Sequence, residues 1–599
     1  MNKRTLVIPM LIAASAFGAL VSVSAPAVAS TQATVLPPAP DVDLNRSMLR
    51  DVKQFTRLVQ QVRYFYPGDA VAATDWDKFV AETVVAMGQV KPHQRRQLGL
   101  TRLREIAPHI SDRRSALEQF ASTDEVAFWL QNGARLAPRF LRFLQLGSYG
   151  EIVPSPYFPD RNVARVNYAG QPLFIPLFLS TQASQEGTPY NDYRHWQVGS
   201  DFASVPVCVS TVSGMWGEIK YFWPYFDQVD VNWNRSLKKL LKACRESQPL
   251  ARIKLIQTEF TKLQDNHVQI TYPDGYGPQN AFLYPFLIKQ VEGKPIVTSV
   301  TAEVEDQLAI GDELLTLNDV PFSDLLEAHM KWSLDSEQFS PFQSTVMLNF
   351  SDSQQPFTAV FKQADGNLVE VEGETVPRFS RVATKDHRVV PRTTEIVTEL
   401  DDGLYKLNLY NLTMDSLTAV RAQLAQAQGV VVDLRHYPRD FAAWHVGVSW
   451  FLKQPATNDD MYRYFRKGPK KQDVYIEQLV RTIEVSPERL DVPVVVLSSR
   501  TSISANEHAL NYIQDAGIPI IGVPTVGING ELMEGRYFAD KPGEGVVFGY
   551  TGMRADNADG TQLIGRGVQP DILVPRTIES VRADVDNQLA AAIEYLKAQ

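Results

Sequence analysis

The chain has 599 residues, of which 44% are apolar and 21% are charged, a composition typical of ordered globular proteins. This length exceeds what one hydrophobic core supports, so about three or four domains are expected. The formal net charge is −9 and the sequence contains no basic run, which argues against a nucleic-acid-binding protein.

The N-terminus has the features of a secretory signal sequence. Lys3 and Arg4 precede an apolar stretch from residue 6 to about 23, and residues 27–29 read Ala-Val-Ala, an A-x-A cleavage site. An uncleaved membrane anchor is the alternative, although the Ala-, Ser- and Gly-rich composition is weakly hydrophobic for a permanent span. No later run is long enough to cross a bilayer. We therefore expect a bacterial protein that is cleaved near Ala29, has no integral membrane span and is periplasmic or secreted.

Cys208 and Cys244 are the only cysteines. In an oxidising compartment they could pair, and two buried, unpaired thiols are equally compatible with the sequence. Neither cysteine lies near a histidine at metal-ligand spacing, so we expect no zinc site, and no other metal or cofactor is expected.

Two aromatic segments repeat with the same spacing. Residues 62–67 read Val-Arg-Tyr-Phe-Tyr-Pro, and Trp76 follows nine residues after the proline; residues 219–224 read Ile-Lys-Tyr-Phe-Trp-Pro, and Trp233 follows at the same distance. We expect an amphipathic helix after each tryptophan and interpret the repeat as an internal duplication of a helical module. The aromatic side chains are expected to pack in the core. The stretch between the copies, about 145–210, is interpreted as irregular β structure.

The C-terminal part alternates between strand and helix patterns. A strand is expected at 404–409, a helix at 414–428 and a buried parallel strand at 429–435, because the last run is continuously apolar. Further on, an apolar strand ends near Leu497, and an apolar run at 518–523 returns to the sheet.

Ser504 lies at the turn between a strand and a helix expected to end near Asp515. At such a turn, unpaired backbone N–H groups and the helix dipole favour an oxyanion. This is a good position for a nucleophilic hydroxyl, although a serine at a helix start is more often a plain N-cap.

Residues 502–507 read Ser-Ile-Ser-Ala-Asn-Glu. This segment resembles the nucleophile segment of the tail-specific, or C-terminal processing, serine peptidases, in which a small residue follows the serine and a glutamate lies three places on. The family includes the tricorn core protease and the repeats of the interphotoreceptor retinoid-binding protein. The resemblance implies that Ser504 is the nucleophile. It also implies an α/β catalytic core with a crotonase/ClpP-like βαβ sheet.

A second motif contains a histidine. Residues 262–268 read Lys-Leu-Gln-Asp-Asn-His-Val and resemble the Leu-x-Asp-Gly-His-Thr segment of the tricorn and retinoid-binding branch, which implies His267 as the base. The matching place of the first helical copy holds His109 without the aspartate, and we interpret this histidine as structural. The tail-specific branch uses a lysine downstream of the serine, but no lysine lies between 504 and 540. A Ser/His arrangement is therefore expected.

Residues 433–438 read Asp-Leu-Arg-His-Tyr-Pro and resemble the Asp-Leu-Arg-Gly-Asn-Pro-Gly-Gly loop of the family. The resemblance implies an oxyanion hole made by the backbone N–H groups of Ala505 and His436. The glycines of the family loop are absent here, and Tyr437 stands where the asparagine would be. Three acids are candidates for orienting the base: Glu507, Glu531 and Glu534.

Residues 309–318 resemble the Gly-Asp-x-Ile-Leu-x-Val-Asn segment of PDZ domains, between a strand expected at 294–300 and a helix expected at 323–330. PDZ folds accept an extended peptide as an added strand.

Residues 548–554 and 565–571 resemble C-terminal signatures of the peptidase family. A last helix at about 577–597 is expected to close the catalytic domain. The expected organisation is a signal peptide at 1–29, a first helical module at 30–145, an irregular β-rich segment at 146–210, a second helical module carrying His267 at 211–279, a PDZ-like domain at 280–375 and the catalytic core at 376–599.

The resemblance implies an exported serine endopeptidase that hydrolyses polypeptides through an acyl-enzyme on Ser504, with His267 as general base. The alternative is a catalytically inactive relative that binds peptides or an apolar ligand on the same fold. The losses in the glycine loop favour this binder, whereas a pure binder has no need of Ser504 and His267 together. The oligomeric state is not predicted.

Overall fold

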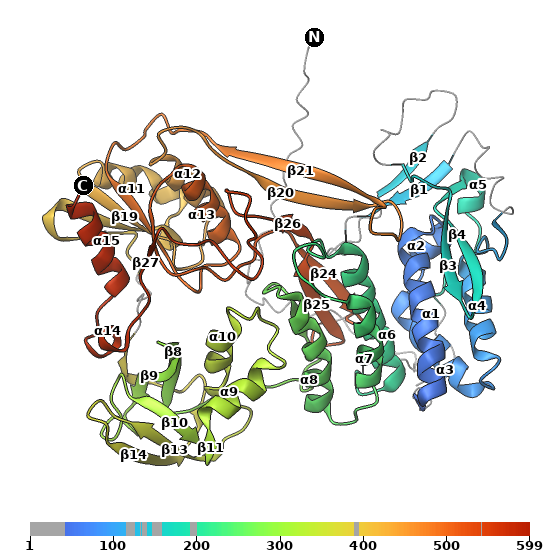
Figure 1. Cartoon of the computed structure of the whole chain (residues 1–599), viewed down its shortest axis with the longest axis horizontal. Helices are drawn as coiled ribbons and strands as arrows, with labels where there is room; N and C mark the ends of the chain where they lie inside the picture. Colours follow the sequence, from blue (N-terminus) through green and yellow to red (C-terminus); the bar gives the residue numbers. More distant parts are fainter. Residues whose placement is uncertain are drawn as a thin grey trace, which may run out of the picture.

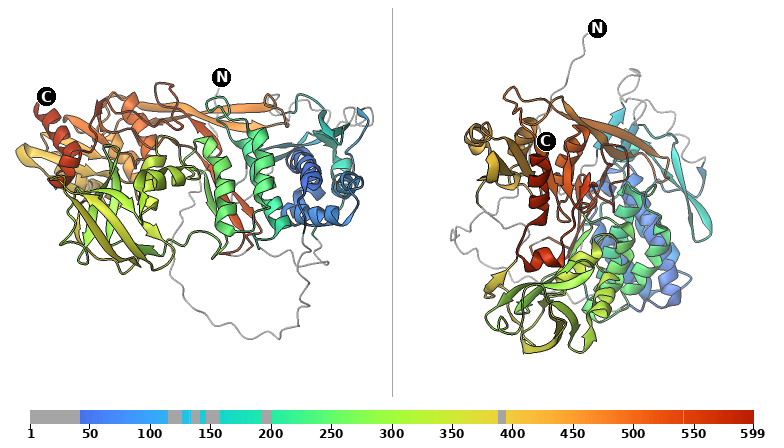
Figure 2. Two further views of the ribbon diagram at one scale, coloured as in Figure 1. Left: turned by 60° about the horizontal axis from the view of Figure 1, so that its bottom comes forward. Right: turned by 60° about the vertical axis from the view of Figure 1, so that its left-hand side comes forward.

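The structure is a computed structural model that describes residues 42–114, 126–131, 133, 141–145, 158–191, 201–387, 394–540 and 542–599. The predicted signal sequence lies outside these residues. Figure 1 shows a helical part and an α/β core at opposite ends of the molecule, with a β-rich domain beside the core; the left view of Figure 2 keeps this order. None of the helices in the described ranges combines the length and the apolarity that a bilayer span requires.

The helical part is built from two sets of helices. Its members are α1 (Arg46–Phe65), α2 (Asp69–Ala73), α3 (Trp76–Gln89), α4 (Arg95–Ile106), α5 (Thr181–Ser184), α6 (Val205–Phe222), α7 (Trp233–Ala243) and α8 (Pro249–Phe260). Helices α1 and α6 each end two residues before a proline, because the residue that precedes a proline is driven to an extended conformation. Trp76 and Trp233 are the first residues of α3 and α7.

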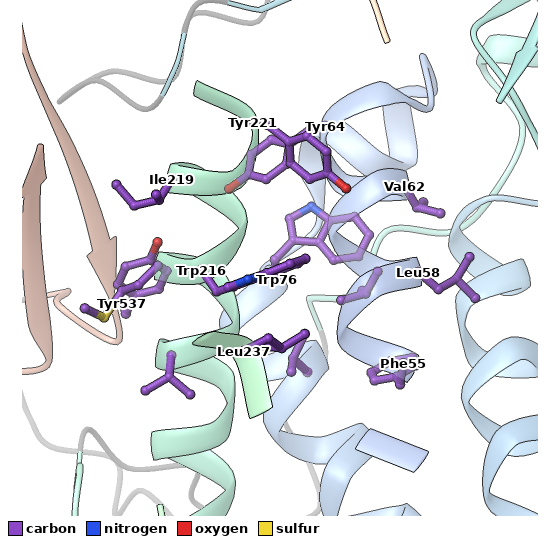
Figure 3. Close-up of a cluster of buried hydrophobic side chains, with 14 of the residues drawn as sticks. Phe55, Leu58, Val62, Tyr64, Trp76, Trp216, Ile219, Tyr221, Leu237 and Tyr537 are labelled. Atoms are coloured by element: carbon purple, nitrogen blue, oxygen red, sulfur yellow. The ribbon is translucent and has the colours of Figure 1, made fainter. Parts of the chain in front are cut away.

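Aromatic side chains of the two repeated segments pack against each other between α1 and α6. The ring centroids of Tyr64 and Phe222 are 4.8 Å apart, and those of Phe65 and Tyr221 are 5.0 Å apart, both edge to face. Figure 3 shows Tyr64 and Tyr221 of these pairs side by side, with Tyr537 on the other side of α6. The repeated aromatic residues therefore form the core of the helical part.

The segment between the two sets of helices contains short antiparallel strands. These are β1 (Val126–Leu130), β2 (Leu141–Gln145), β3 (Val163–Tyr168), β4 (Gln171–Pro176) and β5 (Phe178–Ser180). They form a three-stranded sheet in the order β2-β1-β5 and a hairpin of β3 with β4. The remainder of the stretch expected to be irregular lies partly outside the described residues.

The α/β core contains a six-stranded sheet in the order β17-β18-β19-β22-β23-β27, parallel except for β17. Its strands are β17 (Val397–Glu399), β18 (Leu404–Asn408), β19 (Gly429–Asp433), β22 (Val494–Ser498), β23 (Ile520–Gly522) and β27 (Ile572–Leu573). Helices α11 (Leu417–Leu424), α12 (Phe441–Ser449) and α13 (Ala505–Asp515) cover one face, and α15 (Asn587–Lys597) covers the other. Both faces are buried, which accounts for the continuous apolar runs of the central strands.

Some elements are shorter than the sequence patterns indicated. The helix expected at 414–428 is a 3₁₀ turn (Met414–Ser416) followed by α11. The final helix is two helices, α14 (Ile578–Arg582) and α15, because Asp584 adopts a left-handed φ of 55° between them.

The β-rich domain is an antiparallel arrangement that precedes the core. Its elements are β7 (Phe282–Leu283), β8 (Phe286–Val291), β9 (Lys294–Thr301), β10 (Glu313–Leu317), β11 (Val320–Pro321), α9 (Phe322–Met330), α10 (Ser340–Met347), β12 (Phe350–Ser351), β13 (Pro356–Lys362), β14 (Leu368–Glu374), β15 (Val376–Pro377) and β16 (Ala383–Asp386). Strand β16 pairs with β9 and β8 pairs with the opposite edge of β9. Among the described strands β8 has no second neighbour, so it is an edge strand.

A long hairpin connects the core to the helical part. It consists of β20 (Ala456–Arg466) and β21 (Val474–Ile483), and it spans the top of the molecule in Figure 1. At its tip the backbone N–H of Arg466 donates to the carbonyl of Gln131 at 2.7 Å, and its guanidinium donates to the carbonyl of Tyr221. Strand β26 (Met553–Ala555) pairs with the other edge of β20. The hairpin therefore fixes the two ends of the molecule relative to each other.

Cys208 in α6 and Cys244 at the end of α7 form a disulfide, with Cα atoms 5.6 Å apart. The sequence left this pairing open. Because the bond closes a loop with a sequence separation of 36, it should stabilise the folded protein by about 3–4 kcal/mol.

We expect the double Cys→Ala variant to lose about this free energy of unfolding in chemical denaturation. Reductant should destabilise the parent to the same level and leave the variant unchanged; equal effects on both would contradict the assignment.

Candidate active site

Ser504 occupies a strained backbone position between β22 and α13. Its φ of 56° and ψ of −106° are unusual for a residue with a side chain and cost on the order of 1–3 kcal/mol. Its backbone N–H donates to the carbonyl of Ile528 and to the carboxylate of Glu507, both at 3.0 Å. These bonds hold the turn, so the hydroxyl projects from a fixed point at the start of the helix.

Glu507 is fully buried in the first turn of α13. Besides the N–H of Ser504, its carboxylate accepts hydrogen bonds from the hydroxyl of Thr525 and from the backbone N–H groups of Gly527 and Ile528. Burial raises the pKa of Glu507 to about 7, while these four donors act in the opposite direction. Glu507 therefore clamps the segment 525–528 to the nucleophile turn.

The acids considered for orienting the base do not contact it. All four hydrogen bonds of Glu507 go to the nucleophile turn and the segment 525–528, so the expected orienting role does not fit this geometry. Glu531 binds Arg463 at 2.7 Å, and Glu534 binds Arg536 at 2.8 Å.

His267 reaches the site through strand pairing. Strand β6 (Gln269–Thr271) pairs with β25 (Val546–Thr551), which in turn pairs with β24 (Leu532–Tyr537). Gln269 lies opposite Gly549, and continuing this antiparallel register places His267 opposite Thr551. The imidazole Nδ1 lies 3.0 Å from the hydroxyl oxygen of Thr551. Pairing of β6 with β25 thus places His267, which lies far upstream in the sequence, beside a strand from the C-terminal part of the chain.

Asp265 is the acid that completes this arrangement. Its carboxylate accepts hydrogen bonds from the hydroxyl of Thr551 at 2.9 Å, from the backbone N–H of His267 at 2.9 Å and from the indole of Trp223 at 2.9 Å. The hydroxyl of Thr551 has one hydrogen and donates it to Asp265, so it accepts from Nδ1 of His267. This pattern assigns the hydrogen to Nδ1 and leaves the lone pair on Nε2.

The imidazole of His267 is therefore suited to act as a base. Burial lowers its pKa, and the charge of Asp265 opposes this effect in part. Because the net shift is downward, the ring is neutral at neutral pH, with Nε2 free of any partner among the described residues. A neutral imidazole with a free Nε2 can accept a proton from a hydroxyl.

The nucleophile turn and the segment that carries His267 meet on one residue, Val526. Its backbone N–H donates to the carbonyl of Ser502 at 3.0 Å, and its carbonyl accepts from the side chain of Asn266 at 2.9 Å. Asn266 directly precedes His267, and Ser502 lies two residues before Ser504. Val526 therefore links the segment that carries Ser504 to the segment that carries His267.

The loop after β19 packs against the first turn of α13. The side chain of Asn506 donates to the carbonyls of Leu434 at 2.6 Å and His436 at 2.9 Å. These bonds place Tyr437 beside the nucleophile. Its phenol is hydrogen-bonded to the side chain of Ser504 and accepts from the backbone N–H of Ala505. Burial raises the pKa of Tyr437, and these two bonds lower it.

This arrangement modifies the expected oxyanion hole. The N–H of Ala505, expected to be one of the two donors, is bound to the phenol of Tyr437. The carbonyl of His436, rather than its N–H, is the group tied to the helix. In the described structure Ser504 is bonded to Tyr437 and makes no hydrogen bond to His267. The site is therefore held in a state in which a tyrosine fills the place beside the nucleophile.

Sequence reasoning assigned no role to Asp265, Thr551 or Tyr437. Each lies within a segment that resembles a family motif: Asp265 is two residues before His267, Thr551 is in the segment 548–554, and Tyr437 is next to His436. Their roles depend on strand register and loop packing, which local patterns do not encode. His109 lies in the helical part, away from this network, with its Nε2 3.2 Å from the carboxylate of Glu186.

Residues 403–574 match the family model described as Peptidase family S41. This match indicates that residues 403–574 form an S41 peptidase domain. S41 members are serine peptidases, so the protein is a serine-type hydrolase. The matched region spans the core from β18 to β27 and includes Ser504, whereas His267 precedes it.

The comparison with solved structures finds proteins that are similar to this chain. Mature CPAF is 12% identical with a TM-score of 0.50, and the comparison covers 65% of this chain and 95% of that chain. Mature CPAF complexed with lactacystin is 12% identical with a TM-score of 0.51, covering 65% and 97%. The photosystem II D1 C-terminal processing protease is 14% identical with a TM-score of 0.33, covering 62% and 96%. No curated protein sequence gives a significant match.

Thr551→Val should lower kcat by about 10–100-fold with little change in KM, because Nδ1 of His267 loses the acceptor that fixes its tautomer. Thr551→Ser retains a hydroxyl and should keep most of the activity. Initial rates measured as a function of pH test both variants. For the parent, the acid limb should lie below pH 6.5, the ordinary pKa of histidine, because protonation of His267 removes the base. Equal losses in the Ser and Val variants would contradict the assigned role.

Proposed function

We propose that this protein is an exported serine endopeptidase that cleaves polypeptides through an acyl-enzyme on Ser504. The observation that carries the proposal is the convergence on Val526, which bonds on one side to the nucleophile turn and on the other to the segment with His267. The predicted signal sequence supports export to the periplasm or beyond.

The geometry supports a stepwise mechanism. Nε2 of His267 accepts the proton of Ser504 as its hydroxyl oxygen attacks the peptide carbonyl, and the imidazolium is stabilised through Thr551 by the charge of Asp265. The N–H of Ala505 then donates to the oxyanion. The imidazolium returns its proton to the leaving amine, and a water molecule activated by the same ring hydrolyses the ester.

Substrate must first displace Tyr437. Its phenol binds both the hydroxyl of Ser504 and the N–H that the oxyanion requires. The phenol therefore acts as a resting ligand of the nucleophile, and an incoming carbonyl exchanges for it. The backbone strain at Ser504 is consistent with a residue kept in place for reaction.

We also propose that the β-rich domain is a PDZ-like peptide-binding module. The proposed boundaries of the helical modules and of the catalytic core are those that the sequence indicated. Strand β8 is an edge strand whose backbone N–H and carbonyl at Ile288 are already bonded to the side chain of Asn349, so a peptide would lie against its side chains. A peptide bound there would run toward the core, since β8 and the loop at Ser499–Thr501 line one groove.

The alternative function is that of a catalytically inactive relative that binds peptides or an apolar ligand. The observation that favours it is the bond between Ser504 and Tyr437 in place of a bond between Ser504 and His267. The two functions differ in one property, because only the peptidase needs a reactive hydroxyl.

A fluorophosphonate probe tests the peptidase directly. We expect covalent labelling of the folded protein at Ser504, no labelling of Ser504→Ala, and labelling at least about 10-fold slower in His267→Ala, since the hydroxyl is weakly nucleophilic without its base. Mass spectrometry identifies the modified residue. The matched control is Ser502→Ala, which removes a neighbouring hydroxyl that is bonded to the carbonyl of Leu434. Absence of labelling in the folded parent would favour the binder.

Tyr437→Phe should raise kcat/KM for a peptide substrate by about 3–10-fold, because the ring remains but the hydrogen bonds that substrate must break are lost. Probe labelling of Ser504 should accelerate by a similar factor. Tyr475→Phe, in the hairpin strand β21, is the control for loss of a phenol elsewhere. A fall in kcat would instead make the phenol a donor to the oxyanion and would overturn the resting-ligand role.

A further inference from the structure

Strand β21 of the long hairpin is an edge strand of 10 residues. In the sheet order β21-β20-β26 it pairs with β20 alone among the described strands. Figure 1 shows β21 on the outer side of the hairpin, with β20 between it and the rest of the molecule. An edge strand presents a row of backbone N–H and carbonyl groups that can pair with a further strand. At about 3.3 Å per residue, β21 offers such a row over about 33 Å.

The other sheet edges of the molecule are protected against pairing, whereas β21 is not. Strand β14 exposes Glu370, Glu372 and Glu374 along its seven residues, and the edge of β8 is bonded at Ile288 to the side chain of Asn349. Strands β17 and β27 have only three and two residues. Charged side chains and short strands are the devices that keep an edge from pairing. Strand β21 is long and contains no lysine, proline or glycine.

One face of β21 exposes apolar side chains. Ile476 is 44% exposed and Val480 is 63% exposed, and alternation along the strand places both on the same side. On the opposite side Leu479 packs against Met461 and Met553. β-Branched side chains fit a pleated surface that is half buried, so the exposed side of β21 is suited to being covered by a neighbouring strand.

The two charges of β21 complement each other when the strand pairs with a second copy of itself. Glu477 is bonded to Arg463 at 3.1 Å, whereas Arg481 forms no ion pair with the described residues. In an antiparallel pair centred on Leu479, Glu477 of each copy lies opposite Arg481 of the other, so the two-fold symmetry repeats the favourable pair. Registers centred on 477 or 481 place like charges opposite each other, which destabilises a strand pair.

The same register covers the exposed apolar side chains. Ile476 of one copy lies opposite Thr482 of the other and is the diagonal neighbour of Val480 of that copy. The two hairpin sheets then form one continuous sheet, in which neither β21 is an edge. Since each chain contributes mainly one strand, the interface is at the small end of specific interfaces, and we expect a reversible dimer.

We propose that two copies of this chain associate through β21, strand against strand, in the antiparallel register centred on Leu479. The charge order along β21 favours a second copy over a different polypeptide, because it is complementary to itself. The proposal concerns assembly, goes beyond the proposed peptidase function and does not depend on it.

Sedimentation velocity of the full chain over about 1–100 µM tests the association, because a small interface should give a dissociation constant in this range. We expect the mass to change from that of one chain to that of two as concentration rises. Val480→Lys should raise the dissociation constant at least about 10-fold, since a lysine on an edge strand opposes pairing. The matched control is Glu372→Arg, which changes an exposed residue of the edge strand β14 and should leave the dissociation constant unchanged.

Charge reversal tests the register. Glu477→Arg and Arg481→Glu each place like charges opposite each other and should raise the dissociation constant at least about 10-fold. The double variant restores opposite charges and should return the dissociation constant to within about 3-fold of the parent value. Far-UV circular dichroism and the thermal midpoint establish folding, because Glu477→Arg also loses the contact with Arg463. Arg481→Glu breaks no ion pair among the described residues and tests the register by itself.

A parent that sediments as one chain throughout the concentration range would overturn the proposal and leave the edge to a different polypeptide. A dimer that Val480→Lys leaves unchanged would also overturn it, because the contact would then lie elsewhere on the molecule. A dimer that Arg481→Glu leaves unchanged, or that the double variant does not restore, would contradict the register centred on Leu479.

Discussion

The buried carboxylate of Glu507 holds the catalytic elements together. Its four hydrogen bonds join the nucleophile turn to the segment 525–528, which is otherwise an irregular stretch without strand partners. Val526, in the middle of that segment, then bonds to both Ser502 and Asn266. Strained backbone positions persist only where surrounding contacts determine them. The hydrogen bonds of Glu507 therefore maintain both the strained conformation of Ser504 and the position of the segment that contacts Asn266.

Ser504 and His267, the proposed reacting pair, are positioned by different kinds of structure. Ser504 is fixed locally, by a strand that ends and a helix that begins within a few residues. His267 is fixed through a sheet, because the register of β6 against β25 places it opposite Thr551. Thr551 and Asp265 then determine which imidazole nitrogen carries the hydrogen. The arrangement depends on an antiparallel pair formed between distant parts of the chain.

The arginines near the loop that follows β19 differ in whether they form ion pairs within the fold. Arg435 is fully paired with Asp433 and Asp586, and it connects the end of β19 to the start of α15. Arg500 and Arg576 line the groove beside β8 without such partners. The difference separates an arginine that is neutralised within the core from two that form no ion pair with the described residues.

The sequence by itself indicated the peptidase family and the proposed pair Ser504 and His267, because the segments around these two residues carry short, ordered motifs. It also indicated the main strands and helices of the core, since buried parallel strands are recorded as apolar runs. The disulfide, the break in the last helix at Asp584 and the identity of the orienting groups were decided by the tertiary structure. Glu507 was a reasonable candidate acid by its position near the nucleophile, but its bonds are used within the turn. Asp265, Thr551 and Tyr437 act through strand register and loop packing, and such contacts between distant residues leave no periodic or local pattern in the chain.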